Sequence, residues 1–175
     1  MIKVCISGNA CSGKTTLGEA LADALNIEHI NGTYKQYVKS AKELAGFTLS
    51  AGKKFTNDFD RKVAKEAAKI NCVVTTRLGP WIVKDATVRV WLTASDRERA
   101  RRFGKREGVN FRTAKAEIGR IDSAVVKKFK EVYGIDVEKD HEAFDMELNS
   151  EHMSMKEMVS VISLLAMERD KNRFE

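Results

Sequence analysis

The residues with the clearest chemistry lie near the start of the chain, in a glycine-rich segment from Gly8 to Thr16. The segment fits the pattern G-x-x-x-x-G-K-[ST], in which Gly8, Gly13, Lys14 and Thr15 are the defining residues. An apolar run precedes it and helical periodicity follows it, and the pattern requires this strand, loop and helix context. The segment therefore predicts a loop that binds phosphate groups.

Each residue type in this loop has a physical reason to be there. Glycines at positions 8 and 13 allow backbone conformations that bring successive N–H groups around an anion, and the dipole of the following helix points its positive end there. Lys14 then reaches the β- and γ-phosphates of a nucleotide, and the Thr15 hydroxyl is placed to bind Mg²⁺. The residues expected to contact the nucleotide are Gly8, Asn9, Ala10, Cys11, Ser12, Gly13, Lys14, Thr15 and Thr16.

Segments of strand and helix character alternate along the chain. Apolar runs near residues 2–6, 27–30, 72–76, 88–92 and 144–149 predict five strands. Helical periodicity predicts helices near 17–25, 34–44, 50–71, 95–106, 112–133 and 154–165, with a frayed tail at 171–175. This order predicts an α/β fold, a parallel five-stranded sheet with helices on both faces, in one domain of residues 1–175.

Composition bounds the class of protein. The chain has 175 residues, of which 43% are hydrophobic and 32% charged, as expected for one globular domain and not for a disordered chain. No apolar run approaches the length of a membrane span, so we expect a cytoplasmic protein without a membrane partner. Cys5, Cys11 and Cys72 lack metal-ligand spacing and are expected to be reduced.

The net charge of +6 suits a protein that binds phosphates, and it would also suit one that binds nucleic acid. Basic residues are richest between Arg97 and Arg120, without the regular interleaving of aromatic residues expected of a single-strand platform. Nucleic acid is therefore the less favoured partner. Within this segment Arg99, Arg102 and Arg106 fall on one helix face, where like charges repel unless an anion gathers them.

A further candidate for ligand binding follows the third predicted strand. Arg77 comes at the carboxyl end of the strand near 72–76, the edge at which open α/β sheets bind their ligands. The alternative is a structural role, in which Arg77 pairs with a surface carboxylate.

Four stretches together resemble the archaeal type of cytidylate kinase, within the nucleoside monophosphate kinases. They are the loop at 8–16; residues 71–81 with Arg77-Leu78; residues 90–92 followed by 99–108; and the string Tyr-Gly-Ile-Asp at 133–136. The resemblance covers most of the chain. It implies a P-loop kinase-like fold with a monophosphate-binding region at about 33–71 and a lid at about 103–119.

The resemblance also implies the reaction and its residues. ATP with Mg²⁺ would lie on the loop, and a small-molecule acceptor, CMP or dCMP, would receive the γ-phosphoryl group; we expect a monomer. The residues implied to bind the acceptor are Arg77, Asp60 and Lys35, and those implied to act in catalysis are Lys14, Arg102, Arg106 and Arg120.

Three functions remain open at this point, because the chain departs from the family on the acceptor side. Thr75 stands where the family has a carboxylate, and Lys35 or Gln36 stands where an arginine is expected. The chain is a cytidylate kinase, a kinase of the same architecture for another nucleotide or small metabolite, or a low-turnover ATP-binding regulatory protein that associates with RNA. Steep salt dependence of RNA binding would favour the third.

Overall fold

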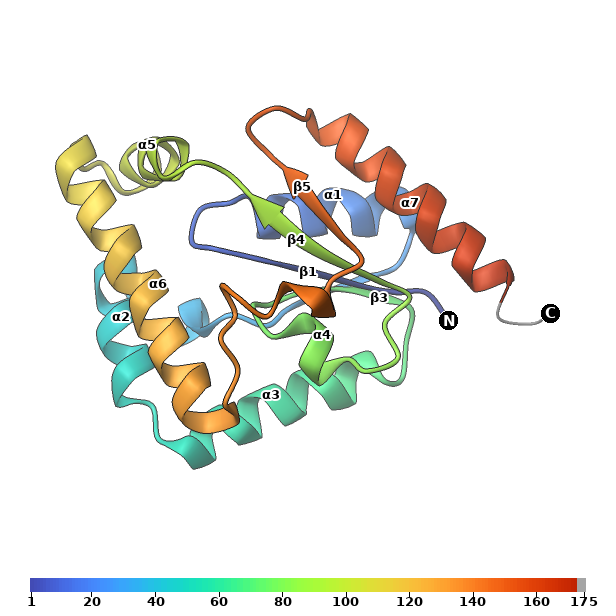
Figure 1. Cartoon of the computed structure of the whole chain (residues 1–175), viewed down its shortest axis with the longest axis horizontal. Coiled ribbons are helices and arrows are strands. Elements are labelled where there is room, and N and C mark those ends of the chain that lie inside the picture. The colour runs from blue at the N-terminus through green and yellow to red at the C-terminus, as the bar shows by residue number, and fades with distance from the viewer. Residues whose placement is uncertain (173–175) are drawn as a thin grey trace.

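A computed structural model describes residues 1–172 and shows a five-stranded sheet with helices on both faces (Figure 1). The strands are β1 (Lys3–Gly8), β2 (Glu28–Asn31), β3 (Cys72–Thr75), β4 (Val88–Thr93) and β5 (Met146–Asn149), in the order β2-β3-β1-β4-β5. Every pair of neighbouring strands is parallel. The predicted sheet is confirmed, with the glycine-rich loop leaving its central strand.

The helices between the strands largely follow the predicted order. They are α1 (Lys14–Leu25), η1 (Tyr34–Tyr37), α2 (Ala41–Ser50), α3 (Lys53–Ala67), α4 (Gly79–Ile82), α5 (Asp96–Glu107), α6 (Phe111–Tyr133), η2 (His141–Ala143) and α7 (Met155–Lys171), where η marks a 3₁₀ helix. No helix within residues 1–172 has both the length and the apolar character needed to cross a membrane. The predicted fraying at the C-terminus concerns residues that, from 173 on, lie outside the described part.

Two helical layers bury the two faces of the sheet. Helices α1 and α7 cover one face, where Leu17, Leu21 and Ile162 are fully buried against strand residues. Helix α3 covers the other face through Phe59 and Val63. Because both faces are covered, the central strands β1 and β3 are buried on both sides and consist mainly of apolar residues, as is typical of parallel sheets.

Helices α2, α5 and α6 form a separate cluster beyond the carboxyl ends of the strands. Phe103 of α5 and Ile118 of α6 are buried there together with Ala45 of α2. In Figure 1, α6 runs past α2, and its C-terminal end approaches α3. The implied lid is therefore a helical hairpin, formed by the end of α5 and the start of α6, and it is in contact with the implied monophosphate-binding region.

The predicted helix at 34–44 is wrong in its first half. Tyr34–Tyr37 forms a 3₁₀ turn, Val38 is extended, and α2 begins only at Ala41. In a 3₁₀ helix residues i and i+3 lie on the same side, so both tyrosine rings reach one aromatic cluster. Their partners there are Phe47, Phe55 and Phe59. Contacts between the rings thus override the apolar periodicity of the segment.

The tight packing of α1 against β3 predicts that alanine has opposite effects on stability at Gly18 and at Gly46. A Cβ on Gly18 would lie 2.3 Å from Thr75 Cγ2 and 2.8 Å from His29 Nε2, whereas a Cβ on Gly46 would meet nothing within 4 Å. Both glycines lie inside helices, where alanine is normally favoured by about 1 kcal/mol. We expect Gly46→Ala to raise the free energy of unfolding in urea and Gly18→Ala to lower it. Stabilisation by both substitutions would contradict the tight contact.

Candidate functional site

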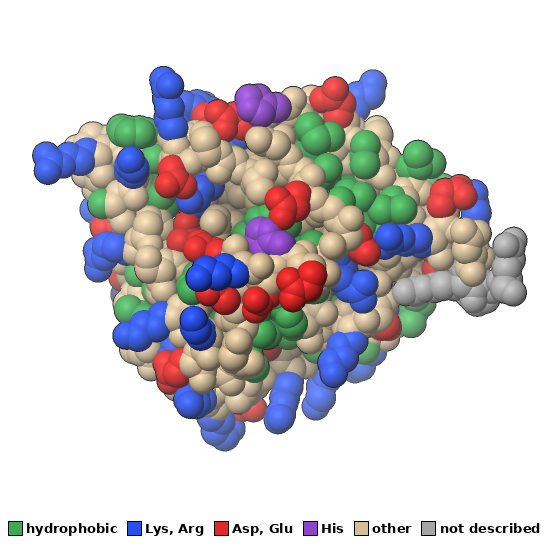
Figure 2. All heavy atoms as spheres, viewed as in Figure 1, with side chains coloured by type: hydrophobic (Ala, Val, Ile, Leu, Met, Phe, Trp, Pro, Cys, Tyr) green, Lys and Arg blue, Asp and Glu red, His purple; other side chains and the backbone are tan. Residues whose placement is uncertain are grey.

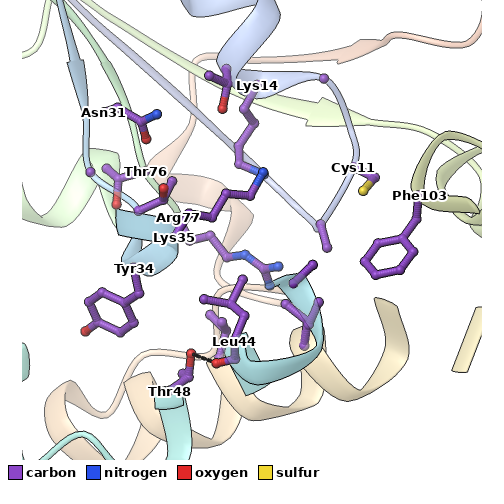
Figure 3. A pocket seen from close by; sticks show the side chains of 18 of the residues that line it. Cys11, Lys14, Asn31, Tyr34, Lys35, Leu44, Thr48, Thr76, Arg77 and Phe103 are labelled. Carbon is purple, nitrogen blue, oxygen red and sulfur yellow. Dashed lines mark hydrogen bonds between the residues drawn. The ribbon is translucent and has the colours of Figure 1, made fainter. Parts of the chain in front are cut away.

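A cavity of about 520 Å³ lies between the glycine-rich loop, η1, α2 and α6 (Figure 3). Lys14 from α1, Lys35 from η1 and Arg77 from the end of β3 extend toward its centre. Tyr34 and Thr48 stand on one side of the cavity, and Cys11 and Phe103 stand on another. Residues that are far apart in the sequence thus surround one space at the carboxyl edge of the sheet, where ligands of open α/β sheets bind.

The loop has the backbone conformation that its glycines predict. Gly8 and Gly13 have φ values of 142° and 103°, and a Cβ on Gly8 would lie 2.3 Å from the carbonyl oxygen of Leu92. Cys11 also has positive φ, 59°. Within the described chain, the amide groups of Cys11, Gly13, Lys14 and Thr15 donate no hydrogen bond. These four donors, at the N-terminus of α1, make the loop ready to hold an anion.

The side chain of Lys14 lies in this loop and faces the cavity. Its Nζ donates to the carbonyl oxygen of Asn9 at 2.7 Å. Burial lowers the pKa of Lys14 well below its usual value, and the cation of Arg77 lowers it further, whereas Asp122 opposes the shift. A bound phosphate group would favour the charged form, so Lys14 is suited to a polyanionic ligand.

Arg77 is held in place by a buried carboxylate on α6. Its Nη2 donates to Asp122 Oδ1 at 2.5 Å, and both side chains are about nine-tenths buried. The same Oδ1 accepts from the amide of Ala10 at 2.9 Å. Arg77 Nη1 is buried without a hydrogen-bond partner in the described chain. Arg77 is therefore fixed by an internal carboxylate and not, as in the alternative given above, by a surface carboxylate, and Nη1 at the other end of its guanidinium has no hydrogen-bond partner in the described chain.

Arg99 takes no part in the arginine face predicted on α5. Its Nη1 donates to Asp122 Oδ2 at 2.6 Å and to the Ala10 carbonyl at 3.0 Å, while Nη2 donates to Asp96 at 2.6 Å. Burial alone would raise the pKa of Asp122, but Arg77, the Ala10 amide and Arg99 together hold it below its usual value. Carboxylates of the protein, and not an external anion, therefore neutralise Arg99.

The other predicted arginines occupy different positions. Arg102 lines the cavity, but its guanidinium donates to Ser12 and Ser150 and its Nε to Glu98. Arg106 also lines the cavity, with its guanidinium 5.4 Å from the centre of the Phe103 ring. Arg106 lies near enough to Lys35 to contribute to the lowered pKa of that lysine, after burial. Arg106 Nε also donates to Glu107 at 2.6 Å, which offsets part of its charge. Lys35 and Arg106, from η1 and α5, still repel each other at this cavity.

Arg120 lies outside the cavity. Its side chain is 65% exposed and pairs with Glu117 at 3.1 Å on the outer side of α6. Ile118 and Ile121 take the inward side of this turn of the helix, which leaves Arg120 facing outward. The structure therefore does not bring Arg120 together with the other predicted catalytic residues.

At the end of the cavity away from the loop lies Asp60 of α3, the one carboxylate among the described residues that line the cavity. Asp60 is 5% exposed, and its Oδ2 accepts a hydrogen bond from the Tyr133 hydroxyl at 2.7 Å. Leu44, Phe59, Val125 and Phe129 surround it with apolar surface. Burial raises the pKa of Asp60 to about 6, although the hydrogen bond from Tyr133 acts in the opposite direction.

A metal site would need donors beyond those of the protein. Thr15 lines the cavity, but the described residues contain no group of three His, Cys, Asp or Glu side chains able to hold a metal ion. Thr75 faces away, with its hydroxyl 2.9 Å from His29 Nε2 under α1. One hydroxyl fits Mg²⁺ that takes its remaining ligands from nucleotide phosphates and water, the usual arrangement for this ion.

The contacts of Asp122, of Ser150 and of the Tyr133 hydroxyl with the site were not predicted from the sequence. The signal for Asp122 was a carboxylate on the apolar side of α6, beside Ile118, Ile121 and Val125. Ser150 directly follows β5 at the carboxyl edge of the sheet, and its hydroxyl donates to the Ser12 carbonyl at 2.7 Å. Both residues attach the glycine-rich loop to later parts of the chain.

The surface charge does not form one basic tract on the face seen in Figure 2. Lys and Arg side chains lie around the rim of this face, and acidic side chains gather toward its centre. A continuous basic surface is the usual footprint of nucleic-acid binding. This face therefore lends no support to the RNA-associated alternative.

The buried carboxylate predicts a dependence of stability on pH. Because the folded protein raises the pKa of Asp60 from 3.8 to about 6, the folded state binds this proton more tightly than the unfolded state does. The resulting stabilisation is present below pH 3.8 and is lost as the pH rises through about 6. Urea unfolding of wild type and of Asp60→Asn tests this between pH 4 and pH 7. We expect the free energy of unfolding of wild type, minus that of Asp60→Asn, to fall by up to about 3 kcal/mol over this range.

Two tyrosines, Tyr133 on α6 and Tyr34 on η1, are the titratable groups that act electrostatically with Asp60, and neither ionises in this range. Asp58→Asn is the matched control, because Asp58 lies on the same helix and pairs with Lys54 at the surface. The difference in free energy of unfolding between wild type and Asp58→Asn should show no such fall between pH 4 and pH 7. A difference between wild type and Asp60→Asn that does not change with pH would contradict the raised pKa.

Comparison with known proteins identifies relatives over most of the chain. Residues 3–152 match the model of the cytidylate kinase-like family. A cytidylate kinase of Thermococcus kodakarensis is 34% identical over 156 residues, which cover 85% of this chain and 79% of the relative. A cytidylate kinase of Ignicoccus hospitalis is 31% identical over 174 residues, covering 95% of this chain and all of the relative.

Solved structures share the fold at lower identity. An uncharacterised protein from Eubacterium ventriosum superposes with a TM-score of 0.70 at 19% identity, covering 95% of this chain and 98% of that one. Shikimate kinase from Acinetobacter baumannii gives 0.61 at 13% identity, covering 96% and 94%. These likenesses show a P-loop kinase-like α/β fold. The family match over residues 3–152, with the relatives at 34% and 31% identity, shows that this chain belongs to the cytidylate kinase-like family.

Proposed function

We propose that this protein transfers the γ-phosphoryl group of ATP to CMP or dCMP. One observation carries the proposal: the free loop amides, Lys14 and the unpartnered Nη1 of Arg77 face a single cavity that ends at Asp60. A donor triphosphate on the loop and an acceptor phosphate on Arg77 would meet in this cavity, with the acceptor base toward Asp60. Curated relatives named cytidylate kinase support the choice of acceptor.

The reaction is a direct displacement at phosphorus. An oxygen of the acceptor phosphate attacks the γ-phosphorus, the bond from that phosphorus to the β,γ-bridging oxygen breaks, and ADP leaves with the bonding electrons. Charge spreads over the transferring group and its neighbours, so positioning and cations supply most of the catalysis. Lys14 and the loop amides would stabilise the donor phosphates, and Arg77 would hold the acceptor phosphate.

Two further cations stand at the same cavity. Lys35 of η1 and Arg106 of α5 both line it, and a phosphoryl group between them would reduce their repulsion. Arg102, which donates to the carbonyl side of the loop, would hold the loop in shape and reach the phosphates only by exchanging those partners. Mg²⁺ bound with the help of Thr15 would supply further charge neutralisation at the phosphates.

A second candidate is the same chemistry on another small acceptor. The observation in its favour is the largely apolar wall around Asp60, formed by Leu44, Ile121, Val125 and Phe129. Such a wall accepts a planar base but offers few polar groups with which to recognise it.

An acceptor screen tests the proposal. With ATP and Mg²⁺, we expect phosphorylation of CMP or dCMP to exceed that of UMP, AMP, GMP and TMP, with the nucleoside diphosphate identified as product. Lys14→Ala should lower the rate by several orders of magnitude while the urea unfolding curve stays cooperative. ATP binding without phosphorylation of any monophosphate would overturn the proposed acceptor. Full activity of Lys14→Ala would overturn the donor site.

A further inference from the structure

Helix α6 is hydrogen-bonded to three other segments through the polar side chains of Asp122, Lys128 and Tyr133. Asp122 holds Arg77 and the loop amide of Ala10, as described above. Lys128, 4% exposed, donates to the carbonyl oxygen of Ala51 between α2 and α3 at 2.7 Å. Tyr133, the last residue of the helix, donates to Asp60 on α3. One helix therefore positions groups at both ends of the cavity.

Asp122 and Tyr133, the first and last of these three residues, lie on one side of α6. Tyr133 comes eleven residues after Asp122, which is close to three full helical turns and about 16 Å along the axis. Asp122 is at the phosphate end of the cavity, beside Arg77, and Tyr133 is at the end where Asp60 lies. The separation between the phosphate-binding group and the carboxylate is thus fixed by a single rigid element.

The hydrogen bond to Tyr133 leaves one carboxylate oxygen of Asp60 for a ligand. Oδ2 accepts from the Tyr133 hydroxyl at 2.7 Å, whereas Oδ1 accepts no hydrogen bond from residues 1–172 and is not sealed off from the cavity. Tyr133 itself does not line the cavity, and its ring lies beside that of Phe129, 6.2 Å between centres. The tyrosine therefore acts on a ligand only through Asp60.

We propose that Tyr133 is a positioning residue that sets the preference for the acceptor base, by aiming Oδ1 of Asp60 at an exocyclic amino group. The inference rests on the function proposed above. An ionised carboxylate only accepts hydrogen bonds. The 4-position of cytosine offers an amino donor, whereas that of uracil offers a carbonyl oxygen, which would face the carboxylate as a second acceptor. A carboxylate without its tyrosine partner is free to turn, and this discrimination weakens.

The test compares CMP with UMP at saturating ATP. Tyr133→Phe should raise the KM for CMP about tenfold, lower the ratio of kcat/KM for CMP over UMP by a similar factor, and leave the KM for ATP unchanged. Asp60→Asn should move the ratio further toward UMP, because an amide nitrogen can donate to the uracil carbonyl. Tyr37→Phe is the matched control, since Tyr37 belongs to the nearby aromatic cluster and its hydroxyl makes no hydrogen bond with residues 1–172; it should change none of these values.

If Tyr133 had a purely structural role, Tyr133→Phe would lower kcat/KM for CMP, UMP and ATP together. If Tyr133→Phe leaves the KM for CMP and the CMP-to-UMP ratio at wild-type values, the inference is overturned while the proposed function stands. If the wild-type protein phosphorylates neither CMP nor UMP, the proposed function fails and the inference fails with it. Should Tyr133→Phe unfold, Asp60→Asn decides alone, and an unchanged CMP-to-UMP ratio in that variant overturns the inference.

Discussion

The buried carboxylate of Asp122, shared between Arg77 and Arg99, is the interaction on which the site depends. Asp122 takes 2.5 Å and 2.6 Å hydrogen bonds from the two guanidinium groups and a third from the Ala10 amide. Burying these charges is costly unless all of them are satisfied, and removing one partner of such a set typically costs 3–5 kcal/mol. The loop, the end of β3, α5 and α6 must therefore adopt their positions together.

The same interaction explains how an arginine can be buried and still keep unused hydrogen-bond donors. Asp122 compensates the charge of Arg77 and takes Nη2, while Nη1 remains without a partner. An acceptor phosphate could therefore bind Arg77 without breaking the contact that holds it. Burial acts differently on Lys14. Burial weakens its hold on a proton, and a bound polyphosphate would restore its charge where it is needed.

Much of the fold follows from local patterns in the sequence. The five strands and the conformations of Gly8 and Gly13 were predictable, because strand runs and the glycine-rich loop each have a signature within a few residues. The end of the helical turn at Val38 was not predictable, because contacts among aromatic rings from three separate segments outweigh helical periodicity there.

The site was predictable only in part, for a similar reason. Lys14, Arg77 and Asp60 line one cavity, as expected of ligand-binding residues, although their roles in binding and catalysis remain proposals. Periodicity placed Arg99 with Arg102 and Arg106, but Asp96 and Asp122 draw Arg99 into the interior. Nothing local distinguishes Asp122 from an ordinary helix carboxylate except its place on the apolar side. Which carboxylate neutralises which arginine is decided by segments distant in sequence.

If Asp122 holds Arg77 in place for the acceptor phosphate, as the proposed function requires, the effects of the two side chains on activity must show coupling. A double-mutant cycle of Arg77→Ala and Asp122→Asn, measured as kcat/KM for CMP at saturating ATP, tests it most directly. Each single variant should be strongly impaired, and Asp122→Asn should lower kcat/KM by a smaller factor in the Arg77→Ala background than in wild type, the remaining loss coming from Arg99 and the Ala10 amide. If the losses of transition-state stabilisation in the two single variants add fully in the double variant, Asp122 and Arg77 act independently, and Asp122 does not work through Arg77.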